Sequence, residues 1–81
     1  SMTDFYHFPM AKMIAAANTP DEHYTRVEVF VSAAKDLEPG QGYTFVTAYD
    51  ANKFFNALEI IYGKGSAARL NKSRTYYVWR E

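Results

Sequence analysis

The sequence predicts a small α+β fold in which one long helix packs on a mostly antiparallel sheet of three strands. Three observations lead to this prediction. The chain has 81 residues, residues 50–62 have the spacing of an amphipathic helix, and three other segments are rich in the β-branched and aromatic residues that favour strands. We therefore expect residues 1–81 to form a single two-layer sandwich with the element order α-β-β-α-β.

The first element expected is a helix from Pro9 to Asn18. Proline suits the first helical position, and an apolar stripe follows, formed by Met10, Met13, Ile14 and Ala17. Residues 19–22 then have the S/T-x-x-E form of a capping box, but at most one helical turn is expected there because a strand pattern begins at residue 24. Ser1, in front of Met2, is expected to be a cloning remnant, and residues 1–8 are the candidate flexible segment.

The next two elements are predicted to be strands at residues 24–32 and 43–49. In the first, the three valines Val27, Val29 and Val31 alternate with Arg26, Glu28 and Phe30. The pair Pro39-Gly40 between the two segments is typical of a turn. Since the connection is short, we expect the two strands to form an antiparallel hairpin.

The clearest element is the long helix over residues 50–62. Its apolar residues follow the i, i+3, i+4, i+7 spacing of one helical face, and they are Ala51, Phe54, Phe55, Leu58, Ile61 and Tyr62. Asp50 is the expected N-cap, because its carboxylate can accept hydrogen bonds from free backbone N–H groups. Gly63 is expected to end the helix, since glycine adopts the left-handed conformation at low cost.

The last predicted strand is residues 75–80, which contain the sequence Tyr-Tyr-Val-Trp. A right-handed crossover through the long helix would place this strand parallel to the second strand and beside the first. The expected spatial order is therefore 2-1-3, with the long helix covering the face of the sheet that carries the three valines. In this arrangement residues 75–80 form an edge strand that is open to strand addition from another chain.

Several classes of function are disfavoured by the sequence. There is no cysteine, and the two histidines, His7 and His23, belong to no set with the ligand spacing of a metal site. The stretch from Gly63 to Ser66 lacks the spacing of a phosphate loop and follows a helix. We therefore expect no catalytic residues, metal, cofactor, small-molecule ligand or membrane contact, and a cytoplasmic location. An enzyme using either histidine stays as a disfavoured alternative.

The formal net charge of zero conceals an uneven distribution of charge. Residues 1–60 have eight acidic and four basic residues, a net charge of −4, whereas residues 61–81 have five basic residues and one acidic residue, a net charge of +4. Aromatic residues lie between the basic ones. This pattern supports nucleic-acid binding as an alternative function, with phosphate contacts from Lys64, Arg69, Lys72 and Arg74.

The leading functional prediction comes from the aromatic residues, which make up 17% of the chain. The predicted strands carry more rings than one helix can cover. Either the helix expected at residues 9–18 covers the second face of the sheet and these rings are core, or they form an exposed surface of the kind that is typical of a binding interface. We therefore expect a small non-enzymatic binding module that contacts a protein partner or a second copy of itself, such as a regulator or inhibitor carried by a phage or mobile element. The expected contact residues are Trp79, Tyr77, Arg74 and Phe30.

Overall fold

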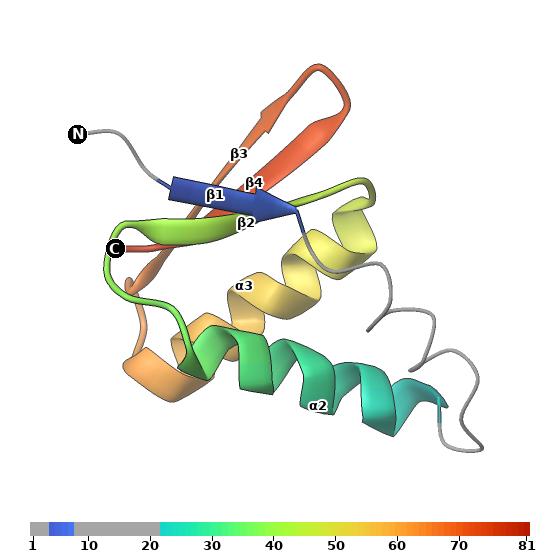
Figure 1. Cartoon of the computed structure of the whole chain (residues 1–81), viewed down its shortest axis with the longest axis vertical. Helices are drawn as coiled ribbons and strands as arrows, with labels where there is room; N and C mark the ends of the chain where they lie inside the picture. Colours follow the sequence, from blue (N-terminus) through green and yellow to red (C-terminus); the bar gives the residue numbers. More distant parts are fainter. Residues whose placement is uncertain (1–3, 8–21) are drawn as a thin grey trace.

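The computed structural model describes residues 4–7 and 22–81, with side chains from residue 28 onward (Figure 1). The elements follow the order β1 (Asp4–His7), α2 (Glu22–Lys35), β2 (Gln41–Phe45), α3 (Ala48–Tyr62), β3 (Ala67–Lys72) and β4 (Thr75–Arg80). The predicted α+β class is confirmed, and the last strand has the predicted bounds. The helix expected at residues 9–18 lies outside the described residues, as do the side chains of both histidines.

The strands form one sheet in the order β1-β2-β4-β3. β4 pairs antiparallel with β2 on one side and with β3 on the other, and β1 pairs parallel with β2. Figure 1 shows both helices on the same side of this sheet, and α3 packs against β2, β3 and β4. The predicted spatial order 2-1-3 is wrong, because the segment predicted to be the central strand is a helix.

That segment is α2, which begins at the last residue of the capping-box sequence and continues to Lys35. Its buried residues follow the i, i+3, i+4, i+7 spacing of a helix: Phe30, Ala33, Ala34 and Leu37, the last of which lies just beyond the helix end. The alternating valines are compatible with a strand by themselves. Burying Phe30 together with the two alanines requires a helix, because in a strand Phe30 and Ala33 would point to opposite faces.

The Pro39-Gly40 turn is confirmed, but it joins α2 to β2 instead of joining two strands, so the predicted hairpin is wrong. Gly40 has φ of 90°, and the Gln41 N–H donates to the Glu38 carbonyl at 3.0 Å. Proline followed by a residue with positive φ is typical of a type II turn. The Gly40 N–H donates to the Arg80 carbonyl at 2.7 Å, which ties this turn to the end of β4.

The long helix α3 begins at Ala48, two residues earlier than predicted, and its N-cap is Thr47 instead of Asp50. The Thr47 hydroxyl accepts a hydrogen bond from the Asp50 N–H at 3.2 Å, which is the usual N-cap contact. The strand predicted at residues 43–49 therefore ends at Phe45. Gly63 ends α3 as predicted, with φ of 102°, and its N–H donates to the Glu59 carbonyl.

The core is a cluster of rings centred on Phe54 of α3, which is fully buried. Its ring centroid lies 5.3 Å from that of Tyr43, 5.4 Å from that of Phe45 and 6.4 Å from that of Phe30. These residues belong to β2 and α2, so one side chain contacts a strand and the other helix at once. Leu58 and Val78, each with 0% exposure, extend the same core along α3 and β4.

A second set of contacts joins the carboxyl-terminal ends of the two helices and of β4. The Tyr62 hydroxyl donates to the Ala34 carbonyl at 2.8 Å. The Arg80 guanidinium lies 3.6 Å from the centroid of the Tyr62 ring and donates to the Leu37 carbonyl at 2.7 Å. Because Arg80 satisfies this carbonyl while stacking on an aromatic face, its charge is used within the fold.

On the face of the sheet away from the helices, β2 and β4 approach closely at Gly42. Gly42 pairs with Trp79, and a Cβ atom added to Gly42 would lie 2.6 Å from the Trp79 Cβ. This distance is shorter than real Cβ contacts allow. Glycine is therefore required at this position for the two strands to keep their register.

Replacing Leu58 with alanine is expected to lower the free energy of unfolding by about 2–5 kcal/mol, because the cavity left in a closed core is only partly filled. The matched control is Ile60→Ala on the same helix, where the side chain is 84% exposed; its effect should stay within about 0.5 kcal/mol. Urea denaturation followed by circular dichroism measures both. Equal effects of the two substitutions would contradict the orientation of α3.

Replacing Gly42 with alanine is expected to destabilise the fold by about 1–3 kcal/mol, since the new methyl group overlaps Trp79 and the Val78 carbonyl. The tryptophan emission should shift at the same time, because the ring has to move away from β2. Val46→Ala, at a residue that is 83% exposed in the loop after β2, is the control. A Gly42→Ala variant as stable as the original chain would show that β2 and β4 are paired differently.

Candidate binding site at the edge of the sheet

β3 and β4 are joined by a two-residue turn, Ser73 and Arg74, whose φ angles are 52° and 63°. Two consecutive positive φ angles are typical of a type I′ turn, in which the flanking residues form a hydrogen-bonded pair. That pair is Lys72 and Thr75. In an antiparallel ladder such pairs alternate with pairs that are not hydrogen-bonded, so the turn determines which backbone groups of β3 point towards β4.

The alternation leaves the backbone groups of Ala67, Arg69 and Asn71 pointing away from β4. At the other end of the strand the Glu81 N–H donates to the Ser66 carbonyl at 2.8 Å, which agrees with this phase. β3 is the last strand of the sheet on this side. Within residues 4–7 and 22–81, the outward N–H and C=O groups of these three residues therefore have no strand partner.

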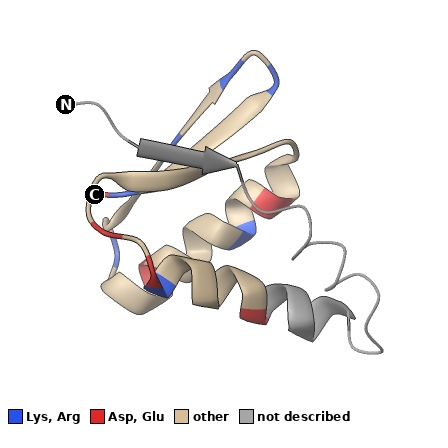
Figure 2. Ribbon diagram, viewed as in Figure 1, with Lys and Arg blue, Asp and Glu red and all other residues tan. Residues whose placement is uncertain are grey.

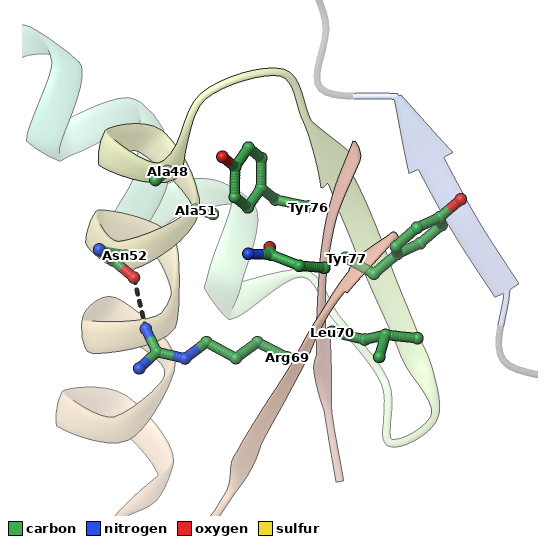
Figure 3. Close-up of a pocket in the computed structure, with 8 residues that line it drawn as sticks. Ala48, Ala51, Asn52, Arg69, Leu70, Tyr76 and Tyr77 are labelled. Carbon is green, nitrogen blue, oxygen red and sulfur yellow. Dashed lines mark hydrogen bonds between the residues drawn. The ribbon is translucent and has the colours of Figure 1, made fainter. Parts of the chain in front are cut away.

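A groove of about 390 Å³ lies between the β3–β4 hairpin and the amino-terminal half of α3 (Figure 3). The helix contributes Ala48, Ala51 and Asn52 to it. The hairpin contributes Arg69, Leu70, Asn71, Tyr76 and Tyr77. Figure 3 shows the Tyr76 ring turned towards the two alanines, whereas Leu70 and Tyr77 point to the other side of the hairpin. The groove therefore lies beside residues 69–71 of β3 and has a mixed polar and apolar lining.

Arg69 is the charged residue of this groove, and α3 holds its side chain from two directions. One guanidinium N–H group donates to the Asn52 amide oxygen (Figure 3). The guanidinium carbon lies 4.8 Å from the centroid of the Phe55 ring. These two contacts orient the guanidinium plane, while the side chain as a whole stays exposed. Such a group can still bind an anion with its remaining donors.

The four basic residues predicted to bind nucleic acid do not form one surface. Lys72 and Arg74 lie together at the tip of the hairpin, whereas Lys64 lies in the turn before β3. The six residues of β3 separate the two ends by about 20 Å. Arg69 faces α3, the side of the sheet opposite to that of Lys72. Figure 2 shows Lys and Arg along the hairpin and in the turn before it, and both basic and acidic residues on the two helices.

Three of the predicted partner-binding residues lie on the hairpin. Tyr77 and Trp79 are on the face of β4 away from the helices, paired with Leu70 and Ala68 of β3, and Arg74 is exposed in the turn. The Trp79 indole N–H donates to a Glu81 carboxylate oxygen at 2.6 Å. Phe30 was wrongly placed on this surface: it lies on α2, is 2% exposed and packs against Phe45.

The predicted edge strand is also corrected, because residues 75–80 lie between β2 and β3 and the edge is β3 itself. β3 was missed because Ala67–Lys72 has a single large apolar residue, Leu70, and shows no alternating pattern. Its turn lacks the glycine or asparagine that usually marks a type I′ hairpin. The signal that the sequence offered for β3 was the strand-forming sequence of β4. A half-buried strand of this kind needs a neighbouring strand on each side, and β3 is the second neighbour. The groove residues Asn52 and Asn71 were likewise not predicted from the sequence.

The described part of the chain shows neither a metal site nor a membrane-spanning helix. Among its residues no group of three or more histidine, cysteine or acidic side chains is placed to hold a metal ion. Neither α2 nor α3 has the length and apolar character needed to cross a membrane. Comparison with known proteins gave no match to a family model, to a curated protein or to a solved structure. Functional inference therefore rests on the geometry of β3 and its groove.

Replacing the turn residues by Ser73→Asn and Arg74→Gly together is expected to raise the free energy of unfolding by about 1 kcal/mol, because both new residues adopt positive φ at lower cost. Thermal and urea unfolding would measure the gain. The control, Ser73→Ala with Arg74→Ala, removes the same side chains without relieving the backbone and should not stabilise. An Asn-Gly variant that is less stable than the original would contradict the type I′ geometry.

Proposed function

We propose that this chain is a non-enzymatic protein-binding module whose β3 edge pairs with an extended segment of a partner protein. The observation that carries the proposal is the open edge of β3, with the outward backbone groups of Ala67, Arg69 and Asn71 beside a groove. Strand addition of this kind obtains affinity from main-chain hydrogen bonds and specificity from pockets for alternate side chains. Both parts are available at this edge.

Side chains on both sides of β3 support the same use. On the side facing α3, the groove offers space for alternate residues of an added strand. On the opposite side, Leu70 is 53% exposed and pairs with Tyr77, so an added strand would gain apolar contact there. Arg74 lies at the tip of the same hairpin, and Trp79 is the next residue of β4 after Tyr77 on the same face. Three of the residues predicted from the sequence thus belong to the hairpin that would receive the added strand.

The occupant we propose is a different protein and not a second copy of this chain. In an antiparallel self-pairing, the register that uses all three open residues places Arg69 opposite Arg69 of the second copy. Like charges directly opposite each other destabilise a strand pair. The exposed bases at the hairpin, including Lys72, also work against stacking identical edges, which is a common protection of edge strands.

Nucleic-acid binding is the other function predicted from the sequence, and at the tip of the hairpin it would use only Lys72 and Arg74. It differs from strand addition in a measurable way, because binding to phosphates weakens steeply with salt. Backbone pairing depends less on salt. A mobility-shift assay with single-stranded RNA and DNA at low salt therefore tests the alternative directly.

The proposal is tested by selecting random dodecapeptides from a display library on the full chain and measuring their affinity by fluorescence anisotropy. Asn71→Pro is expected to lower the affinity for the selected peptides by about tenfold or more, since proline removes an outward N–H without removing a hydrogen bond to β4. Asn71→Ala, which loses the same side chain and keeps the N–H, should change the affinity by less than about threefold. Circular dichroism checks that both variants fold.

Two results would contradict the proposal of strand addition. One is a library that yields no peptide, and the other is a set of peptides that bind the proline variant as tightly as the alanine variant. Sedimentation of the chain at high micromolar concentration provides an independent check. A stable dimer that dissociates on Asn71→Pro would replace the partner protein by a second copy of this chain.

A further inference from the structure

If β3 accepts a partner strand, as proposed above, every second side chain of that strand faces α3. Successive residues of a strand point to opposite faces, so the partner residues beside Arg69 and Asn71 would face the groove on the α3 side. The chemistry of the groove therefore selects the side chains at alternate positions of the partner. Arg69 lies at the middle of the three open positions and dominates this chemistry.

The guanidinium of Arg69 is held in place before any ligand arrives. Its bond to Asn52 and its stacking on Phe55 use one edge and one face of the group. Arginine has five N–H donors in a planar fork, and Asn52 is the acceptor that it contacts among residues 28–81. The remaining donors match the two oxygens of a carboxylate, and an oriented fork loses little freedom on binding it.

The surroundings of Arg69 reinforce this preference for an anion. The groove lining includes no acidic side chain, and its other polar groups are the amides of Asn52 and Asn71 and the Tyr76 hydroxyl. Amide N–H₂ and phenolic O–H groups can donate to an oxygen anion. Arg74, in the turn that follows the strand, adds positive potential. A cationic side chain in the same place would meet Arg69 without any compensating charge.

We propose that the strand added to β3 carries an aspartate or glutamate at the position facing α3 beside Arg69, and that the Arg69 guanidinium binds its carboxylate in the groove. The module thereby recognises an extended acidic segment of its partner. Main-chain pairing supplies affinity for any extended peptide, whereas the carboxylate fixes the register, because only one alignment brings it to Arg69.

The test uses the dodecapeptides selected on the full chain and determines which of their positions carry Asp or Glu. The expected result is enrichment of Asp or Glu at one fixed position, with alternate positions free to vary. Changing that residue to Gln or Asn in the peptide should weaken binding to the original chain by about tenfold. This arm changes only the peptide, so it does not depend on the folding of a protein variant.

The partner of the carboxylate is identified by a double-mutant cycle. Arg69→Gln should lower the affinity for the acidic peptide by a similar factor and should leave the affinity for the Gln or Asn peptide nearly unchanged. Lys72→Gln is the matched control, because it removes one positive charge from the same strand on the side away from the groove; it should change affinity by less than about twofold. Urea unfolding of each variant measures how far the free energy of unfolding falls when the contact between Arg69 and Phe55 is lost.

The outcomes separate the two proposals. In one outcome, Asn71→Pro lowers the affinity for the peptides, but the peptides show no acidic enrichment or no coupling to Arg69. This result would overturn the carboxylate site and leave strand addition standing. Equal effects of Arg69→Gln and Lys72→Gln would also overturn it, because they would indicate only a general attraction between charges. A failure of the proline test, by contrast, removes strand addition itself and the carboxylate site with it.

Discussion

The structure depends on the burial of one ring, Phe54, at the point where the sheet meets both helices. The ring contacts Tyr43 and Phe45 from β2 and Phe30 from α2, with edge or tilted geometry of the kind that aromatic pairs favour. A chain of this length buries a smaller fraction of its unfolded surface than a larger domain does, so a few large side chains supply much of the hydrophobic free energy. The position of α3 on the sheet, and of α2 on α3, follows from this contact.

The same constraint creates the candidate site. Because Phe54 and Leu58 hold α3 against β2 and β4, the turns of α3 that contain Asn52 and Phe55 lie beside β3 and determine where the Arg69 side chain goes. β3 itself contributes nothing to the fully buried core. It is held by pairing with β4 and by the contacts of Arg69 with α3. A strand attached in this way keeps one edge open while its position stays fixed, which suits strand addition.

The distribution of rings and charges has a different meaning in the folded chain than along the sequence. Phe30 is one of the rings expected to form a surface, yet it fills the core. Arg80 belongs to the basic carboxyl-terminal quarter, yet it stacks on Tyr62 and satisfies a carbonyl at the end of α2. Of the remaining bases, Arg69 faces the groove, Lys72 and Arg74 lie at the hairpin tip, and Lys64 lies in the turn before β3. These four charges are therefore spread along β3 and its two ends.

The sequence by itself determined the elements whose signal is local and complete: the body of α3 with its end at Gly63, the strand β4, and the turn at Pro39-Gly40. In α3 the apolar periodicity and the terminal Gly63 agree, β4 is rich in residues that favour strands, and Pro39-Gly40 is a turn sequence. Tertiary structure decided the rest. Residues 22–35 have valines that suit a strand and a Phe30-Ala33-Ala34 spacing that suits a helix, and packing against α3 chose the helix. β3 has almost no pattern of its own, and it is a strand because β4 offers a free edge on which its backbone groups find partners.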